Sequence, residues 1–140
     1  MKAPVKRRYA KVPARFDSSE VLRLMEKERI DSLYLSLLKG ISQFSDETIA
    51  DMLHVNVKTY RSYRDKNEIL RKDIQERTLM LLSLLKHGIM VFGDSETFTQ
   101  WLESENAMLG NTTPIGYLDT ISGIKLIDDR LTGIEYGDHA

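Results

Sequence analysis

Ammonium, guanidinium and hydroxyl groups gather in one short stretch near the middle of the sequence. The residues that carry them are Lys58, Thr59, Arg61, Ser62 and Arg64. At helical spacing the first four lie opposite an apolar face made by Val57, Tyr60 and Tyr63. Hydrogen-bond donors of these types suit the phosphates and base edges of DNA. The pattern predicts that the first four contact DNA and that Arg64 binds a phosphate.

Two short helices would position these donors. Ser45 can cap the first helix, because its hydroxyl accepts a hydrogen bond from an amide of the first turn, and Asn56 can cap the second. Together they predict a helix-turn-helix, in which the small side chain of Ala50 allows a close crossing. The first turn position usually holds Gly, whereas here it holds His54, which tolerates a left-handed backbone better than most side chains do. The alternative is a pair of ordinary packed helices with a solvated basic face.

The composition is that of a globular protein. A chain of 140 residues suits one compact unit or two small modules, and 41% hydrophobic residues suffice for an interior. The absence of cysteine excludes disulfides and thiolate catalysis and fits a reducing compartment. No apolar signal segment follows the basic start, and the apolar run over residues 79–92 is too short to span a bilayer. These features predict a soluble, cytoplasmic protein without a membrane partner.

The net charge of −1 hides a strong asymmetry. Residues 1–90 contain 18 Lys and Arg against 12 acidic residues, and residues 91–140 contain 2 against 9, so the two parts carry +6 and −7. Such a split indicates different partners for the two parts, one of them a polyanion. The alternative is that each part simply has a solvated surface, which would give the same split in charge. Residues 1–16 hold six basic residues and no acidic one, which predicts a flexible arm that binds phosphates beside the helix-turn-helix or else a solubilising tail.

No region shows the alternation typical of strands, so the sequence predicts an all-α fold. A helix capped by Ser18 or Ser19 and ending near Arg29, and another capped by Asp31, are expected to pack against the helix-turn-helix. Gly40 would stop the second of them. The expected organisation is a helix-turn-helix domain over residues 17–70, a connecting Leu-rich helix over residues 71–92 and a small helical domain over residues 93–140.

The connecting helix is apolar nearly all round between Leu79 and Leu85. A helix of this kind is buried on several sides, so we expect it to be a shared spine or part of a dimer interface. A homodimer is also expected because one helix-turn-helix supplies few base contacts and dimers commonly bind two half-sites. Beyond this helix, short helices are expected near residue 95 and at Thr113, and a last helix punctuated by Gly123 should stop at Gly133.

Catalysis by this chain is improbable on its residues. The three histidines, His54, His87 and His139, are scattered and lack the spacing of metal ligands. Asp128 and Asp129 are adjacent on a helix and point about 100° apart, so they cannot form a facing carboxylate pair. Because no nucleophile–base set and no Gly-rich phosphate loop is present, the sequence predicts neither an enzyme nor a cofactor or metal site.

The last third of the chain carries an ordered set of motifs: FGD, WLESENAMLGNTTPIGYLDTISG and IEYG. This segment resembles the C-terminal domain of Xre-type antitoxins of the MbcA/ParS group, whose partners are RES-domain toxins. The helix-turn-helix and the Leu-rich helix also follow the family order, so the resemblance extends over most of residues 40–140. The matching positions are Phe92, Gly93, Asp94, Trp101, Leu102, Asn106, Leu109, Gly110, Pro114, Leu118, Gly123, Tyr136 and Gly137.

The resemblance implies an antitoxin that covers the active site of a RES-type, NAD-consuming toxin and represses its own operon by binding operator DNA. In the family the C-terminal tail enters or covers the toxin's active site. One departure is Gly133, where relatives often have a basic residue. The alternative is a helix-turn-helix regulator whose C-terminal domain only dimerises or senses a ligand. The residues that the resemblance assigns to toxin binding are Ile134, Glu135, Tyr136, Gly137, Asp138 and His139.

Overall fold

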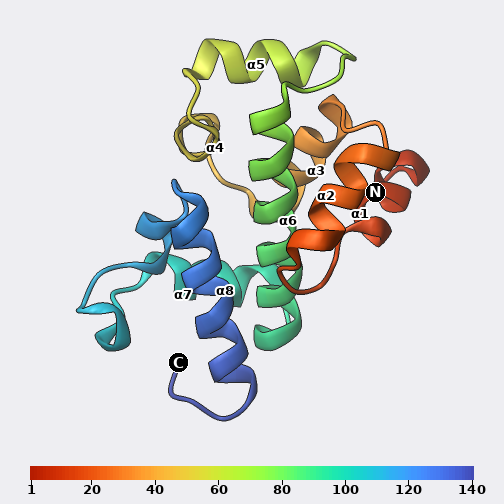
Figure 1. Cartoon of the computed structure of the whole chain (residues 1–140). Helices are drawn as coiled ribbons and strands as arrows, with labels where there is room; N and C mark the ends of the chain where they lie inside the picture. The colour runs from red at the N-terminus through yellow and green to blue at the C-terminus, as the bar shows by residue number, and fades with distance from the viewer.

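The computed structural model describes residues 1–140 and contains eight α-helices, two short 3-10 helices and no strand, which confirms the all-α fold. None of the helices has both the length and the apolar composition needed to cross a membrane. In chain order the elements are α1 (Ala3–Lys11), α2 (Ser18–Lys27), α3 (Ser32–Ser42), α4 (Asp46–Leu53), α5 (Val57–Asp65), α6 (Lys72–Phe92), α7 (Ser95–Glu103), η1 (Ala107–Leu109), η2 (Pro114–Tyr117) and α8 (Ile121–Glu135) (Figure 1).

Helix α6 is the axis of the molecule (Figure 1). It packs against α2, α3 and α4 from the first half of the chain and against α7 and α8 from the second half. Every residue from Leu79 to Leu85 is at most 2% exposed, because helices from both halves surround this part of α6. The expectation of a shared spine is therefore confirmed. The stretch offers no apolar face to a second copy, so the expected dimer surface on this helix was wrong.

A single cluster of 28 buried apolar residues extends from Val12 to Leu131. The α4–α5 pair contributes Ile49, Ala50 and Tyr60 to it, and α8 contributes residues from the other end of the chain. The first and second halves of the sequence consequently share one core. A destabilising change in either half is expected to reach the other through this core.

Helix α1 replaces the flexible arm that the sequence predicted for residues 1–16. Arg8 donates hydrogen bonds of 3.1 and 2.8 Å to the carboxylate of Asp31, which is only 2% exposed. Lys86 of α6 donates to the backbone oxygens of Tyr9 and Val12 at 3.0 and 2.9 Å. The sequence prediction failed because it treated the basic residues as unpaired, whereas partners distant in sequence hold this segment.

Two helices of the first half differ at their ends from the prediction. Asp17, rather than Ser18 or Ser19, caps α2, and its side chain accepts a hydrogen bond from the amide of Glu20. Asp31 caps α3 as expected, but the helix runs past Gly40 to Ser42, and Gln43, whose φ is 60°, is its C-cap. The stop moves because Gln43 adopts the left-handed conformation that was expected of a glycine.

Helix α8 passes through both glycines that were expected to punctuate it. Gly123 lies in its first turn, where a Cβ would stand 1.8 Å from the backbone oxygen of Tyr117. Gly133 lies in its last turn, where a Cβ would stand 2.5 Å from a carboxylate oxygen of Asp138. Both glycines are therefore positions of close approach within the helix.

Candidate functional site

Helices α4 and α5 form the first candidate site, and their local geometry follows from their caps. The Ser45 hydroxyl accepts a hydrogen bond from the amide of Thr48 at 3.1 Å, and the Asn56 side chain accepts one from the amide of Thr59 at 2.8 Å. Both caps were predicted and are confirmed. His54 has a φ of 58°, so it does adopt the left-handed conformation that the turn requires. Its Nε2 donates to the backbone oxygen of Asp119, a contact that the sequence did not predict.

The five expected DNA-contacting residues fall into two groups on α5. Lys58, Thr59 and Ser62 line a hollow of about 360 Å³ together with Tyr63 and Glu68. Lys58 is exposed and forms no hydrogen bond or ion pair within the chain. This side of α5 is open and carries the donor types that were expected.

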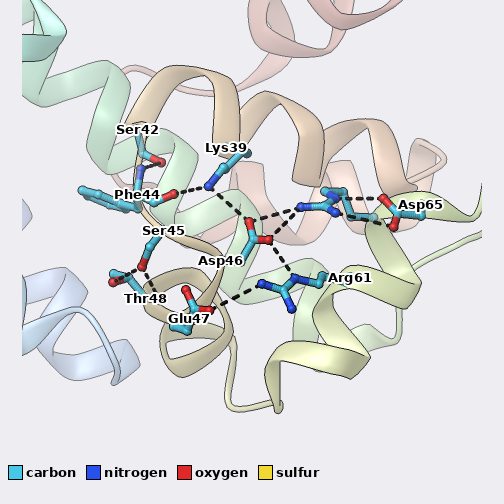
Figure 2. Close-up of polar contacts among 10 residues, drawn as sticks. Lys39, Ser42, Phe44, Ser45, Asp46, Glu47, Thr48, Arg61 and Asp65 are labelled. Carbon is cyan, nitrogen blue, oxygen red and sulfur yellow. Dashed lines mark hydrogen bonds and ion pairs between the residues drawn. The ribbon is translucent and has the colours of Figure 1, made fainter.

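Arg61 and Arg64 form the other group, and both are bound to carboxylates. Figure 2 shows Arg61 beside Asp46 and Glu47. Arg61 Nε lies 2.9 Å from Asp46 Oδ2, and Arg64 Nη1 lies 3.1 Å from both oxygens of the same carboxylate. Lys39 Nζ adds a third contact to Asp46 at 3.1 Å. Hydrogen bonds from Arg61 and Lys39 hold the pKa of the Asp46 carboxyl well below its usual range. The sequence did not indicate that Asp46 is the common partner of these three cations.

An aromatic cluster and one tight approach shape the second candidate site, the C-terminal region. The rings of Phe92, Phe98 and Trp101 lie with centroids 5.4 to 6.1 Å apart. Phe98 is fully buried and lies directly over Gly88, where a Cβ would stand 2.2 Å from the ring. Asp94 caps α7 through the amide of Thr97. These contacts fix α7 against the end of α6.

An ion-pair network centred on the buried His87 connects α6, α8 and the N-terminal segment. His87 is fully buried and donates from Nδ1 to Asp128 at 2.8 Å and from Nε2 to Glu135 at 3.1 Å. Arg15 binds the other oxygen of Glu135. Burial by itself lowers the pKa of His87, but the hydrogen bonds to the two carboxylates outweigh burial and the pKa is raised. The spacing of residues in the sequence did not indicate these ion pairs, because the residues that form them are far apart in sequence.

The C-terminal tail folds back onto this region instead of extending from it. Arg130 binds the carboxylate of Asp138 at 3.1 Å and also the backbone oxygen of His139. The backbone oxygen of Ala140 accepts hydrogen bonds from Trp101 Nε1 at 3.1 Å and Asn106 Nδ2 at 2.9 Å. The tail is therefore held at several points, which the sequence did not indicate.

Within this folded tail the six expected toxin-binding residues differ in exposure. Tyr136 is 76% exposed and forms no side-chain hydrogen bond. Glu135 is engaged by His87 and Arg15, and Ile134 is partly buried. Gly137 has a φ of 106°, which favours glycine and turns the chain back. The Tyr136 side chain is consequently available to a partner.

Both candidate sites lie at the surface of the protein. No group of three or more His, Asp or Glu side chains in residues 1–140 is arranged to hold a metal ion. Residues 87–137 match the family model of the antitoxin Xre/MbcA/ParS C-terminal toxin-binding domain. No curated protein matches the chain.

The matched residues start at His87 and end at Gly137, so they include α7, α8 and Tyr136. The match supports an Xre-type antitoxin of a toxin–antitoxin system, and a toxin-binding domain implies a toxin partner. A domain of an antitoxin family also suggests a non-enzymatic role. The α4–α5 pair lies outside the matched residues.

Proposed function

We propose that this protein neutralises a RES-type, NAD-consuming toxin by covering the toxin's active site, and that it represses its own operon through α4 and α5. The observation that carries the proposal is the match of residues 87–137 to a toxin-binding domain of antitoxins. The exposed Tyr136 at the end of those residues supports the first part. Toxin binding by the C-terminal region and DNA binding by the first half would also account for the opposite charges of the two parts of the chain.

Charge complementarity supports the tail as the element that reaches the toxin. Residues 91–140 carry a charge of −7, and an enzyme that consumes a dinucleotide needs a positive pocket to hold phosphates. Tyr136 supplies a flat aromatic anchor of the type found at interface hot spots. Glu135, the last residue of α8, serves mainly to hold the end of α8 against α6, because it is bound to His87. Ile134 of the same helix is partly buried. The remaining contact residues are Gly137, Asp138 and His139.

The test is co-expression with the product of the neighbouring gene, with growth and complex formation as readouts. The variant Tyr136→Ala is expected to lose about 2 kcal/mol or more of binding if Tyr136 is a hot spot, which lowers affinity about 30-fold. Leu22→Ala is the matched control, because Leu22 is also exposed, at 59%, but lies on α2 outside the matched residues. A truncation should remove residues 136–140 and retain Glu135, so that the contact to His87 stays intact. Full protection by both the variant and the truncation would refute the tail mechanism.

Repression is proposed on the α4–α5 geometry. The two caps and the left-handed His54 give the turn expected of a helix-turn-helix, and the open Lys58 side of α5 offers donors to DNA. We retain the homodimer in this proposal, because two half-sites are commonly bound by two copies, with an interface outside the buried stretch of α6. Binding to the DNA upstream of the chain's own coding sequence, measured at several salt concentrations, tests it. A protein that binds that DNA but neither binds nor neutralises the neighbouring product would be a regulator without a toxin partner.

A further inference from the structure

The contact between α4 and α5 is built around one carboxylate. Asp46 is the first residue of α4 and its side chain is only 16% exposed. Figure 2 shows it between Lys39 of α3 and Arg61 of α5. Arg64, one turn further along α5, binds both of its oxygens. A single acidic side chain thus accepts contacts from three cations that belong to two neighbouring helices.

The charges in this cluster cancel. Arg61 Nη2 also lies 3.4 Å from Glu47, and Arg64 Nε lies 2.9 Å from Asp65. Lys39, Arg61 and Arg64 supply three positive charges, and Asp46, Glu47 and Asp65 supply three negative ones. The group of charges around the two arginines of α5 is therefore neutral overall, although the sequence of α5 is basic.

Each arginine is also held by more than one contact. Arg61 has two carboxylate partners. Arg64 has two as well, its side chain is 26% exposed, and its guanidinium lies 5.5 Å from the ring centroid of the buried Tyr60. A DNA phosphate that bound either guanidinium through two donors would compete with these carboxylates for charge-assisted hydrogen bonds of the strong kind. Lys58, by contrast, is exposed and has no partner to lose.

We infer that Asp46 limits the DNA-contacting surface of this protein by holding Arg61 and Arg64 against α4, so that only the side of α5 with Lys58, Thr59 and Ser62 meets DNA. The inference rests on the proposed function of α4 and α5. It identifies Asp46 as a positioning residue that sets how many phosphates the protein neutralises. It also removes Arg61 and Arg64 from the contacts that the sequence predicted.

The experiment measures affinity for a mixed-sequence duplex of about 30 base pairs, long enough for two half-sites, over a range of salt concentrations. Each neutralised phosphate contributes about 0.9 to the slope of log affinity against log salt. Asp46→Asn removes the charge that binds Arg61 and Arg64 and is expected to steepen the slope by about 0.9 for each arginine released. Between 50 and 200 mM salt that adds about a 3.5-fold loss of affinity per released arginine.

Glu47→Gln is the matched control for Asp46→Asn. It changes the net charge by the same amount on the same helix turn, but Glu47 has only the one contact at 3.4 Å and its side chain is 66% exposed. Two further variants test the inference without disturbing Asp46. Lys58→Gln is expected to reduce the slope by about 0.9, whereas Arg61→Gln is expected to leave it unchanged. Circular dichroism and thermal unfolding of each variant verify that the helices are intact.

The possible outcomes distinguish a failure of this inference from a failure of the DNA-binding proposal on which it rests. A steeper slope for Asp46→Asn than for Glu47→Gln, with Arg61→Gln unchanged, supports the inference. If folded Asp46→Asn binds DNA more weakly, Asp46 instead supports arginines that do contact DNA, and the inference is wrong. It is also wrong if Arg61→Gln reduces the slope as much as Lys58→Gln does. If neither the wild-type protein nor Asp46→Asn binds any duplex, the DNA-binding proposal itself fails and the inference falls with it.

Discussion

Replacing Gly88 by alanine tests whether the contact between α6 and α7 is as tight as the structure shows. A Cβ at this position would lie 2.2 to 2.4 Å from three atoms of the Phe98 ring. Favourable carbon contacts begin at about 3.5 Å, so the ring would have to move by more than about 1 Å. Phe98 is fully buried and packs against the rings of Phe92 and Trp101, which leaves it little room to move.

The magnitude follows from two opposing effects. Overpacking of a core costs about 1–3 kcal/mol. Alanine in a helix interior is favoured over glycine by about 1 kcal/mol, which offsets part of that cost. Because the Phe98 ring has little room to move, the overpacking cost lies in the upper part of that range, at about 2–3 kcal/mol. We therefore expect Gly88→Ala to reduce the free energy of unfolding by about 1–2 kcal/mol, which for a chain of this size lowers the melting temperature by about 3–10 °C.

Gly40→Ala is the matched control, because it makes the same substitution inside α3. A Cβ at Gly40 meets nothing within 4 Å, so only the gain in helix propensity remains. This variant is expected to raise the melting temperature by a few degrees, measured by circular dichroism under the same conditions. The opposite signs of the two changes are the test. If Gly88→Ala stabilises the protein as Gly40→Ala does, the close approach of α6 and α7 is refuted.

A second comparison tests whether the ring of Phe98 causes the loss of stability in Gly88→Ala. Phe98→Leu shortens the side chain that the new Cβ would meet, so the double variant with Gly88→Ala should lose less stability than the two single changes add up to. Coupling energies of contacting residues are about 0.5–3 kcal/mol, large enough to measure by denaturant unfolding. Strict additivity would mean that Phe98 is not the residue that resists the alanine.

Two further outcomes follow from buried contacts of the C-terminal region. The pKa of His87 is raised above its ordinary value of 6.5, so the stability from its bonds to Asp128 and Glu135 is fully present below that value and is lost as pH rises through the raised pKa. The free energy of unfolding measured in urea between about pH 6 and pH 9 should show this decline, and His87→Gln should remove it. If the free energy of unfolding of His87→Gln falls with pH as steeply as that of the wild-type protein, other groups cause the decline. Gly123→Ala should destabilise the protein more than Gly88→Ala, because its Cβ would meet backbone, at 1.8 Å from the Tyr117 oxygen, rather than a side chain. Equal melting temperatures for the two alanine variants would contradict that ordering.

Local signals in the sequence predicted most of the secondary structure, because they act within a few residues. Helix caps and the apolar length of α6 depend on neighbouring residues that can be read directly from the sequence. The capping residues are Ser45, Asn56 and Asp94. The expected bounds of α6 agree with the structure for this reason. Glycines misled the prediction at Gly40 and in α8, since a glycine stops a helix only where the backbone turns left-handed and elsewhere can simply admit a close neighbour.

Contacts between distant residues account for what the sequence did not indicate. The basic segment 1–16 was expected to be flexible because Asp31 and Lys86 are far from it in sequence, although both hold it in the structure. The same reason explains why Arg61 was predicted to face DNA while it binds Asp46, 15 residues earlier. Residue type indicated which groups could bind an anion. Only the fold shows which of them an internal carboxylate already occupies.

The shared core determines which variants can separate the two proposed activities. Because one buried cluster joins both halves, a change such as Gly88→Ala is expected to impair toxin binding and DNA binding together through the fold. Surface changes avoid this coupling. Tyr136 and Lys58 are both exposed, unbonded through their side chains and placed on different halves of the chain. Tyr136→Ala should therefore weaken protection while it retains the salt-dependent DNA binding, and Lys58→Gln should reduce the salt slope of DNA binding while protection is retained. If either variant loses both activities with its melting temperature unchanged, the two surfaces are not independent.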